Sequence, residues 1–347
     1  EEGIINPKTN FEIGWNLLRR YLGSNFQKFQ KTTNQAFHSS GLLPSLLDKK
    51  INNADSDIIN LHWFQGEMLS IRAIGRIKKP IIFTLHDSWA FLGTEHYPNG
   101  YDDNRYIEGY SKNNKPENSK GLDLDRISWQ MKKRYWKSKY QIISPSNWLA
   151  TCVKKSSLMN NWPITVIPNP VPTNIFKKSP KNFSRKIFNL ELDKKYILFG
   201  ALKGSSEPRK GLDLLQRALK IIPNNNKKIE AIIIGENEPI NPPKSRIKIN
   251  YFGTFQDNQT LALIYSAVDL VLVPSRMDNL PQTATEAITC GTPVAAFNCS
   301  GLPEVIDHKK TGYLADPFEI KSLAKGIEWI LEDNDRLLEL SENCREK

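Results

Sequence analysis

The sequence lacks long apolar runs, and cysteine is scarce in it. No stretch approaches the roughly 18 consecutive apolar residues of a membrane-spanning helix, and 39% hydrophobic with 24% charged residues is typical of a water-soluble chain. The four cysteines, at positions 152, 290, 299 and 344, include no Cys-x-x-Cys pair. They match neither a disulfide framework nor a zinc site, so we expect reduced thiols. The chain also has no initiator Met and no charged-then-apolar leader, and we expect it to be cytoplasmic.

Acidic residues are too few to balance the basic ones, and the imbalance is local. The formal net charge is +11, and residues 1–180 hold 25 Lys and Arg against 15 Asp and Glu. Such a field attracts anionic partners, which include nucleic acids, acidic membranes and phosphate-bearing substrates. The sequence has no recognisable helix-turn-helix, zinc-finger or RNA-binding signature, so we expect no nucleic-acid partner.

The first half of the chain alternates short β-branched runs with helical patterns. Runs that are apolar on both faces suit strands of a parallel sheet that helices cover on each side. Residues 98–120 are polar and tyrosine-rich without periodicity, and they indicate a surface loop. The pattern predicts strands at 57–61, 81–85, 141–144 and 164–167, with helices at 68–77 and after Ser146.

A polar, Lys-rich segment at 169–195 precedes a second alternation and is the best linker candidate. We therefore expect two domains, at 1–175 and 176–347. The alternation in the second half predicts a doubly wound α/β domain. Its expected strands are 196–200, 231–235, 247–252, 270–274 and 294–297, and its expected helices are 212–222, 259–267 and 281–290.

Two carboxylates follow the expected strand at 270–274. Asp278 lies in the loop after that strand, and Glu286 lies in the helix that Pro281 opens, where a first turn tolerates proline. In doubly wound sheets, ligands bind beyond the carboxyl ends of the strands. A carboxylate there can accept hydrogen bonds from the vicinal hydroxyls of a ribose or a hexose. Asp278 and Glu286 are therefore candidate sugar-binding residues.

Two adjacent cations, Arg209 and Lys210, lie between the strand at 196–200 and the helix at 212–222. Cations at a helix N-terminus can neutralise a diphosphate, and the helix amides add to that field. A further turn, Ser300-Gly301-Leu302, follows the strand at 294–297 and opens another helix, where a glycine lets the backbone approach a ligand. Both segments are candidates to bind phosphate.

These motifs resemble the retaining glycosyltransferases of family 4, which have the GT-B fold. The family carries two acids with seven residues between them before a Cys-Gly-x-Pro-Val turn, as Asp278 and Glu286 do here. The resemblance runs over residues 57–331 and is strongest over 196–315. Segments 60–63 and 95–98 are similar to a bacterial polysaccharide and lipopolysaccharide biosynthesis branch, although the cysteines which that branch carries after the second segment are absent here.

The resemblance implies a role for each candidate residue. Glu286 would hold the ribose of the nucleotide, and Asp278 would face the donor sugar. His86, which follows the strand at 81–85, falls where the family has a histidine near the same sugar. Asp278 replaces the commoner Glu and is one methylene shorter, so the donor-sugar preference does not carry over. The donor phosphates would be bound by Arg209, Lys210, Ser300, Gly301 and Leu302.

The fold implied is α/β, with two Rossmann-like doubly wound domains facing a cleft and the family's N-terminal strand and loop missing from residues 1–50. The implied reaction is transfer of a sugar from a nucleotide-sugar to a glycan or lipid-linked acceptor by a hexosyltransferase-type enzyme (EC 2.4). No Asp-x-Asp element follows a strand, so we expect no metal and no other cofactor. Two alternatives stay open: a nucleotide-sugar epimerase of the same architecture, or a non-catalytic sugar-binding or nucleic-acid-binding protein.

Cations and aromatic residues crowd the segment 126–139, which the pattern predicts to be helical. Such a helix can lie at an anionic membrane surface, and an ordinary solvated face over a packed core is the alternative. A peripheral contact with the inner face of the membrane would suit a lipid-linked acceptor. The cations concerned are Arg126, Lys132, Lys133, Arg134, Lys137 and Lys139.

Overall fold

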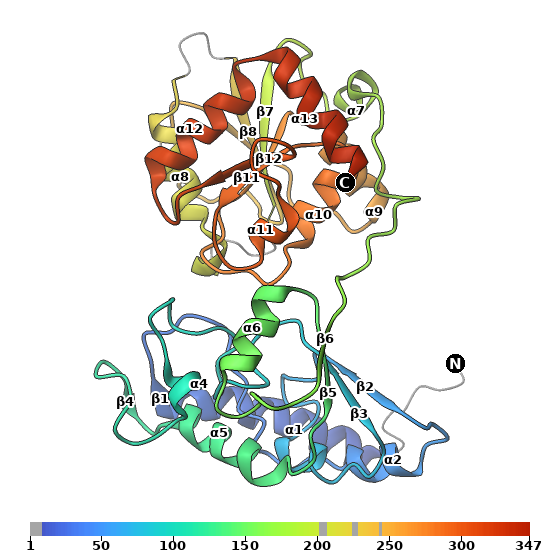
Figure 1. The fold of residues 1–347 in the computed structure, drawn as a ribbon, viewed down its shortest axis with the longest axis vertical. Helices are drawn as coiled ribbons and strands as arrows, with labels where there is room; N and C mark the ends of the chain where they lie inside the picture. The colour runs from blue at the N-terminus through green and yellow to red at the C-terminus, as the bar shows by residue number, and fades with distance from the viewer. Residues whose placement is uncertain (1–8, 201–206, 224–227, 243–244) are drawn as a thin grey trace. The chain divides into compact units, whose positions relative to one another are not determined.

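A computed structural model describes residues 9–200, 207–223, 228–242 and 245–347. The chain folds as two compact units, the first ending at Pro168 and the second beginning at Asn169 (Figure 1). The sequence places the boundary at 175, seven residues later. We call the two parts the first unit and the second unit.

The first unit is built on a four-stranded parallel sheet in the order β2-β3-β5-β6. A separate antiparallel pair joins β1 to β4. Helix α6 packs on β5 and β6, and α3 packs on α5. The elements are α1 (Asn10–Phe26), β1 (Gln30–Lys31), α2 (Leu47–Asn53), β2 (Ile59–His62), α3 (Ile71–Ile74), β3 (Ile81–Thr84), α4 (Arg105–Glu108), β4 (Lys120–Gly121), α5 (Leu124–Tyr135), β5 (Gln141–Ser144), α6 (Asn147–Lys155) and β6 (Ile164–Val166).

The second unit is built on a six-stranded parallel sheet in the order β12-β11-β10-β7-β8-β9. Its strands are β7 (Lys195–Gly200), β8 (Ile229–Ile234), β9 (Lys248–Tyr251), β10 (Leu270–Val273), β11 (Val294–Phe297) and β12 (Gly312–Ala315). Its helices are α7 (Lys181–Ile187), the 3-10 turn Pro208–Lys210, α8 (Leu212–Ile221), α9 (Asn258–Ala267), α10 (Gln282–Thr289), α11 (Leu302–Val305), α12 (Ile320–Leu331) and α13 (Asn334–Glu346).

This strand order is that of a doubly wound nucleotide-binding domain, and it fixes where a ligand can bind. From β7 the chain proceeds outward through β8 to β9, whereas from β10 it proceeds the other way through β11 to β12. The two neighbouring strands β7 and β10 therefore form the topological switch point, where the loops at the carboxyl ends diverge and leave a crevice.

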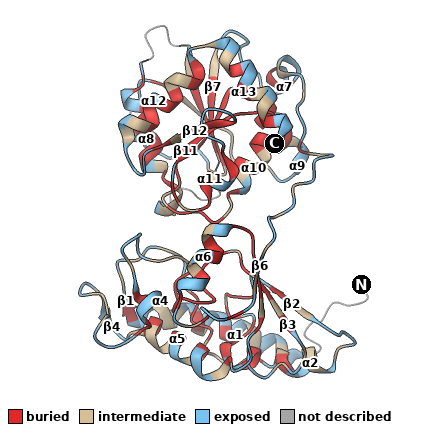
Figure 2. Ribbon diagram, in the orientation of Figure 1, coloured by how far each residue is buried: buried red, intermediate tan, exposed pale blue. Residues whose placement is uncertain are grey.

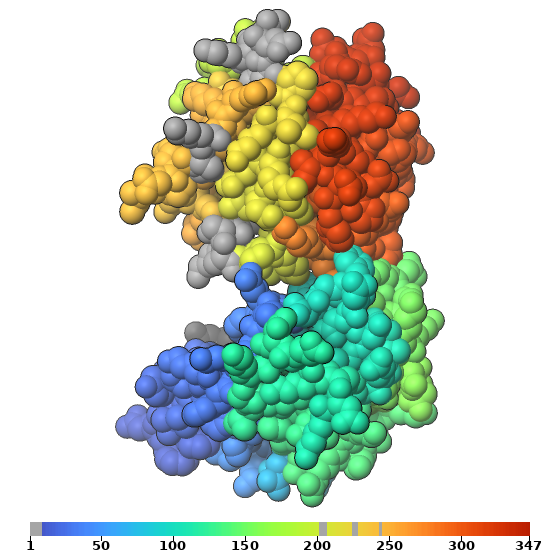
Figure 3. All heavy atoms as spheres, turned by 90° about the vertical axis from the view of Figure 1, so that its left-hand side faces the viewer, coloured from blue at the N-terminus to red at the C-terminus, as the bar shows by residue number. Residues whose placement is uncertain are grey.

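Helices cover both faces of the second sheet. Helix α12 packs on α8 and on β10 and β11, while α10 packs on α9 and on the same two strands. Figure 1 shows α8 and α12 on one side of the sheet and α9 and α10 on the other, and Figure 3 shows the yellow residues from α8 onward against the red C-terminal ones. All residues of β10 and β11 are buried as a result, and Figure 2 shows the buried residues around β11 in red.

Three expectations about local structure are wrong. The linker predicted at 169–195 contains helix α7, which packs on α9, and its Arg185 is buried in an ion pair with Asp269. The loop predicted at 98–120 contains helix α4, and its Tyr110 is buried. The helix predicted at 68–77 is limited to Ile71–Ile74, because Ser70 caps its start and Gly75 caps its end.

Residues 9–50 contribute α1, α2 in part and β1, and none of them joins the parallel sheet of the first unit. All four cysteines are free thiols. In the part of the chain that the structure describes, no helix is both long and apolar enough to span a membrane.

The structure of helix α5 corrects the expectation that all the cations of segment 126–139 can face a membrane. Lys132 points into the protein and is fully buried, with Nζ 3.7 Å from the centre of the Trp89 ring. It donates to the carbonyls of Trp89, Leu92 and Gly93, so it cannot contact a membrane. Of the other cations of the segment, Lys133, Arg134, Lys137 and Lys139 are exposed, and Arg126 is half-buried.

Candidate active site

Asp278 lies in the loop after β10 and is buried, at 6% exposure. Its carboxylate accepts from Lys210 Nζ at 2.8 Å and lies 3.4 Å from Arg209 Nη1. Ser275 Oγ is also 3.4 Å away. The two expected phosphate-binding cations and the expected sugar-binding acid therefore meet at one point, the switch point of the sheet.

Electrostatics favour the ionised form of Asp278. Burial alone would raise the pKa of this carboxyl, but the charges of Lys210 and Arg209 outweigh burial and lower it. The carboxylate is therefore charged at neutral pH. It holds the Lys210 ammonium at the start of α8, where helix amides would also face an anion.

The loops around Asp278 approach each other closely. Gly211, at φ +75°, has no room for a side chain because a Cβ there would lie 2.0 Å from the carbonyl oxygen of Pro274. A Cβ on Gly301 would lie 1.5 Å from the carbonyl oxygen of Asn279. The β7–α8 loop and the β11–α11 turn are therefore both pressed against residues 274–279.

The turn at 300–302 supports the backbone of Asp278. Ser300 Oγ accepts from the Asp278 amide at 3.0 Å, and the Gly301 amide donates to the Asp278 carbonyl at 2.9 Å. Leu302 is buried and begins α11, which is a single turn of four residues. Ser300 and Gly301 thus contact the loop that carries Asp278, and α11 is too short to provide much dipole field.

Glu286 is half-buried on α10, one helix beyond Asp278. Tyr265 on α9 donates its hydroxyl to Glu286 Oε2 at 3.0 Å. Burial raises the pKa of Glu286, and the Tyr265 bond opposes that rise only in part. The bond fixes the orientation of the carboxylate, which is what a binding role for its other oxygen requires.

Arg209 is held more firmly than Lys210. Its guanidinium donates to the carbonyl of Met277 at 2.7 Å and to Glu207 Oε1 at 2.6 Å. The carbonyl of Arg209 accepts from the amide of Arg276 at 2.8 Å. Residues 201–206, where family members often place a phosphate-binding Arg after the strand, lie outside the described residues.

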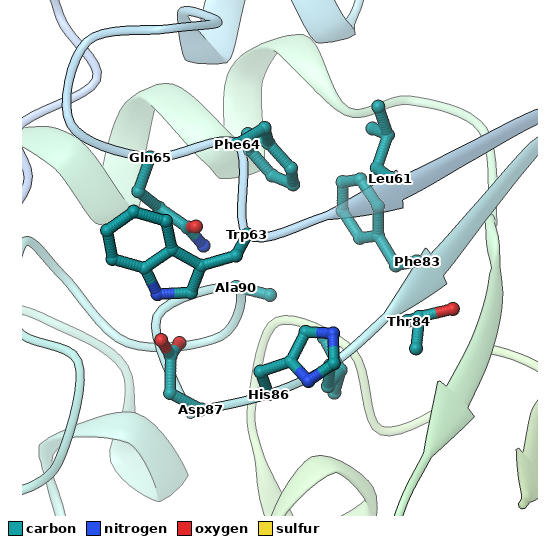
Figure 4. Close-up of a pocket in the computed structure, with 10 residues that line it drawn as sticks. Leu61, Trp63, Phe64, Gln65, Phe83, Thr84, His86, Asp87 and Ala90 are labelled. Atoms are coloured by element: carbon teal, nitrogen blue, oxygen red, sulfur yellow. The ribbon is translucent and has the colours of Figure 1, made fainter. Parts of the chain in front are cut away.

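His86 lies in the first unit at the end of β3, in a pocket that Figure 4 shows. Its Nε2 is 3.1 Å from Nδ1 of His62, which ends β2. Burial, then His62, lower the pKa of His86, while Asp87 opposes them. The imidazole is therefore neutral at neutral pH and can accept a proton.

The same pocket has an aromatic wall and two planar polar groups. Trp63 is 51% exposed and stands over Asp87 in Figure 4, with the Gln65 side chain behind it. Gln65 Oε1 is buried without a hydrogen-bond partner. Trp63 adopts φ +35°, a backbone conformation that costs energy for a bulky residue and often occurs at functional sites.

Sequence reasoning missed three residues of these sites, and for two of them a signal existed. His62 is paired with Thr84 in neighbouring parallel strands, and His86 follows Thr84 by two residues. The two histidines therefore lie at the carboxyl ends of neighbouring strands. Tyr265 lies on the buried face of its helix, where a phenol needs a partner. Gln65 gave no signal, because the loop that turns it into the pocket is irregular.

The fold and these two sites define a two-domain α/β protein of the GT-B class. Residues 180–347 match the family described as glycosyl transferases group 1, and residues 20–175 match the family described as Glycosyltransferase Family 4. The chain belongs to family 4 of the glycosyltransferases, as its sequence motifs predict.

Similar proteins of known name cover parts of the chain. The D-inositol 3-phosphate glycosyltransferase of Thermobispora bispora is 28% identical over 193 residues, which are 51% of this chain and 44% of that protein. The Mycolicibacterium smegmatis protein of the same name is 29% identical over 180 residues, 49% of this chain and 40% of that one. The chain thus spans less than half the length of these curated relatives.

Solved structures confirm the predicted GT-B fold. Sucrose-phosphate synthase from Thermosynechococcus elongatus superposes with a TM-score of 0.64 at 20% identity, over 86% of this chain and 70% of that one. HepE from Anabaena, solved with UDP-glucose, gives a TM-score of 0.62 at 19% identity, over 86% and 75% of the two chains. At these identities the likeness concerns the fold alone.

Proposed function

We propose that this protein is a retaining glycosyltransferase that moves a sugar from a nucleotide-sugar donor to a glycan or lipid-linked acceptor. One observation carries the proposal: the switch point of the second unit gathers two cations and the carboxylate of Asp278, with Glu286 on the helix that follows. Such groups recognise the diphosphate and the hydroxyls of a nucleotide-sugar. Family membership supports transfer chemistry, and the fold neighbour HepE, solved with UDP-glucose, supports the donor class.

Each group has a role in this proposal. An ammonium has three donors, so Lys210 can keep its bond to Asp278 and still donate to a phosphate oxygen. Glu286, oriented by Tyr265, accepts from the ribose hydroxyls. Asp278 faces the donor sugar beside the phosphates. As the bond between the anomeric carbon and the diphosphate breaks, the cations stabilise the charge of the leaving group.

The acceptor belongs to the first unit in this proposal. The apolar face of a pyranose packs on an aromatic ring, while its hydroxyls bond planar groups such as those of Gln65 and Asp87. The Trp63 pocket offers both kinds of surface, with His86 beside them. This combination favours a glycan over a purely apolar acceptor.

A donor panel tests the function. Mass spectrometry of products from UDP-, GDP- and ADP-sugars, each with and without glycan or lipid-linked acceptors, is expected to show transfer with one donor. Epimerised donor in the absence of any acceptor would mean an isomerase. Binding of a sugar without turnover of any donor would mean a non-catalytic module.

The nucleotide site has a matched pair of variants. Glu286→Gln is expected to weaken binding of the nucleotide that the panel selects by about 1.5–3 kcal/mol, because it removes a charged acceptor. Glu339→Gln, on the exposed face of α13, is the control and should bind normally. Equal affinity of both variants and wild type would remove Glu286 from the nucleotide site.

The two cations can be ranked. Lys210→Ala is expected to reduce turnover more than Arg209→Ala, because Arg209 already donates to Met277 and Glu207. The measurement is kcat/KM of both variants, with circular dichroism to show that each is folded. The reverse order would mean that Arg209 leaves these partners to bind the donor.

The proposed reaction needs no metal at the donor site. Arg209 and Lys210 would take the place of a divalent cation at the diphosphate. Turnover is therefore expected to survive EDTA and to gain nothing from added Mg²⁺ or Mn²⁺. Activity that EDTA abolishes and Mg²⁺ or Mn²⁺ restores would contradict this mechanism.

A peripheral membrane contact is part of the proposal, with fewer cations than the sequence implies. Each exposed Lys or Arg near an acidic bilayer contributes about 1 kcal/mol, and Lys133, Arg134, Lys137 and Lys139 qualify. Sedimentation with anionic vesicles should therefore recover more wild type than the Lys133→Ala, Arg134→Ala double variant. Equal recovery would exclude this helix from membrane binding.

A further inference from the structure

A second cluster of chemical groups lies in the first unit, outside the His86 pocket. It consists of His38, Glu95 and Asp125, which come from three separate segments. His38 and Glu95 face each other across an isolated antiparallel bridge, and Asp125 lies in the first turn of α5. One side-chain ligand atom from each residue lies within 4.8 Å of the other two.

Each of the three side chains is oriented by a partner on its outer atom. His38 Nε2 lies 3.3 Å from the carbonyl of Asn34, and Asp125 Oδ2 accepts from Gln30 Nε2 at 2.6 Å. The buried hydroxyl of Tyr110 donates to Glu95 Oε1. Such outer partners are typical of metal sites, where the second ring nitrogen of a histidine ligand usually donates to a carbonyl or carboxylate.

The inner atoms of the cluster face one another. His38 Nδ1 is 3.7 Å from Asp125 Oδ1 and 2.8 Å from the hydroxyl oxygen of Thr94, which also bonds Asp125 Oδ1. Two ligands bound tetrahedrally at about 2.1 Å lie somewhat more than 3 Å apart. The observed separation is close to that spacing.

Glu95 gives the second, independent indication of a ligand. It is 3% exposed, and its Oε2 atom is buried without any hydrogen-bond partner. An unpartnered carboxylate oxygen beside a second carboxylate lacks a positive charge to bind.

The nearby cations do not fill that place. Lys132 Nζ donates to three backbone carbonyls, as described above. Arg105 donates to Asp123 at 2.9 Å and comes no closer than 3.9 Å to the outer oxygen of Asp125, Oδ2. Neither directs a donor to the space between the inner atoms.

We propose that His38, Glu95 and Asp125 bind a structural divalent transition-metal ion. One imidazole and two carboxylates suit Zn²⁺ at bond lengths of about 2.0–2.2 Å. The ion would tie residues 34–38 and the segment after β3 to α5, and it takes no part in the donor site. The proposal does not depend on the glycosyltransferase function.

The first experiment uses wild-type protein alone. Elemental analysis of protein purified without chelators is expected to find close to one equivalent of metal. After removal of the metal, Zn²⁺ should raise the melting temperature again, while Mg²⁺ at the same concentration should not. If Zn²⁺ does not change the melting temperature of the metal-free protein, the proposal is overturned. That result would mean that Glu95 and Asp125 share a proton instead.

Variants then locate the ion. Glu95→Gln removes a ligand. Tyr110→Phe removes only the hydrogen-bond partner of Glu95, and the loss of such an outer partner typically lowers metal affinity about 10–100-fold. Zn²⁺ affinity is measured by competition with a chromophoric chelator. Glu108→Gln, an exposed acid on neighbouring α4, is the control. If Glu95→Gln does not fold, Tyr110→Phe still decides. Wild-type affinity in Tyr110→Phe, or an equal loss in Glu108→Gln, would overturn this location.

Discussion

In both units helices cover a parallel sheet, but the side chains buried in the two cores differ. In the second unit, β10 and β11 are buried at every position, and the core around them is mostly aliphatic. In the first unit, β2 and β3 are only partly buried, and the core beside them holds Trp89, Trp136 and the ammonium of Lys132. The core beside β3 therefore depends on satisfied polar groups, whereas the core around β10 and β11 depends mainly on packing volume. Polar groups are the more specific and the less tolerant of the two.

The largest expected effect is on the first unit. Lys132→Ala leaves the carbonyls of Trp89, Leu92 and Gly93 without their donor and should cost about 4 kcal/mol. Urea unfolding followed by tryptophan fluorescence reports this unit, because seven of the eight tryptophans precede residue 169. Lys133→Ala, the exposed neighbour, should change stability by less than about 0.5 kcal/mol. If both variants lose a similar free energy of unfolding, the first unit does not depend on the buried ammonium of Lys132.

The next effect is on the second unit. Leu272→Ala opens a cavity in a strand that is buried on both faces and should cost about 3 kcal/mol. Far-UV circular dichroism should show the earlier transition, while the tryptophan transition of the first unit stays in place. Leu338→Ala, at a position 56% exposed, is the control. A matching shift in tryptophan fluorescence would show that the units unfold together.

The smallest effect is a difference in pH dependence between two buried acids. Burial raises the pKa of Glu67 in the first unit, while the cations lower that of Asp278 in the second despite its burial. A raised pKa means stability that is present below about pH 4.3 and is lost as pH rises through the folded value. A lowered pKa means stability that is present above about pH 3.9 and is lost as pH falls through the folded value.

Two variants measure this difference. Relative to its wild type, Glu67→Gln should gain stability as pH rises from 4 to 7. Asp278→Asn should be less stable than wild type at pH 7, and the gap should close below pH 4. Urea unfolding at several pH values measures both. The same sign of slope for the two variants would mean that the units do not differ in how they accommodate buried acids.

The sequence predicted the second unit better than the first, for a physical reason. Apolar runs such as that of β10 require burial on both faces, and the predicted strand at 270–274 differs from Leu270–Val273 by one residue. Helix α7 was missed because its Arg185 looks solvated, and only the fold shows that Asp269 neutralises it. Charged residues that the core accepts through distant partners leave no periodic signal.

In the candidate site, too, local patterns predicted some features, whereas others depend on residues far apart in sequence. Rules for strand ends placed Asp278, Lys210 and His86 at carboxyl ends of strands, where they lie. Which groups touch depends on contacts between residues far apart in sequence, such as the bond from Lys210 to Asp278. The burial of Lys132 was likewise unpredictable, since its neighbours Lys133 and Arg134 are exposed on the same helix.

The close approach of the loops around Asp278 requires that positions 211 and 301 carry no side chain. At Gly211 and Gly301, even a single methyl carbon would overlap a carbonyl oxygen of the 274–279 loop. Because both contacts bear on the same short segment, a side chain at either glycine would displace the segment that carries Asp278. The backbone at the switch point is therefore restricted to one conformation. New ligand preferences can arise by substitution of the side chains around the crevice, but hardly by a change in the backbone of the loops.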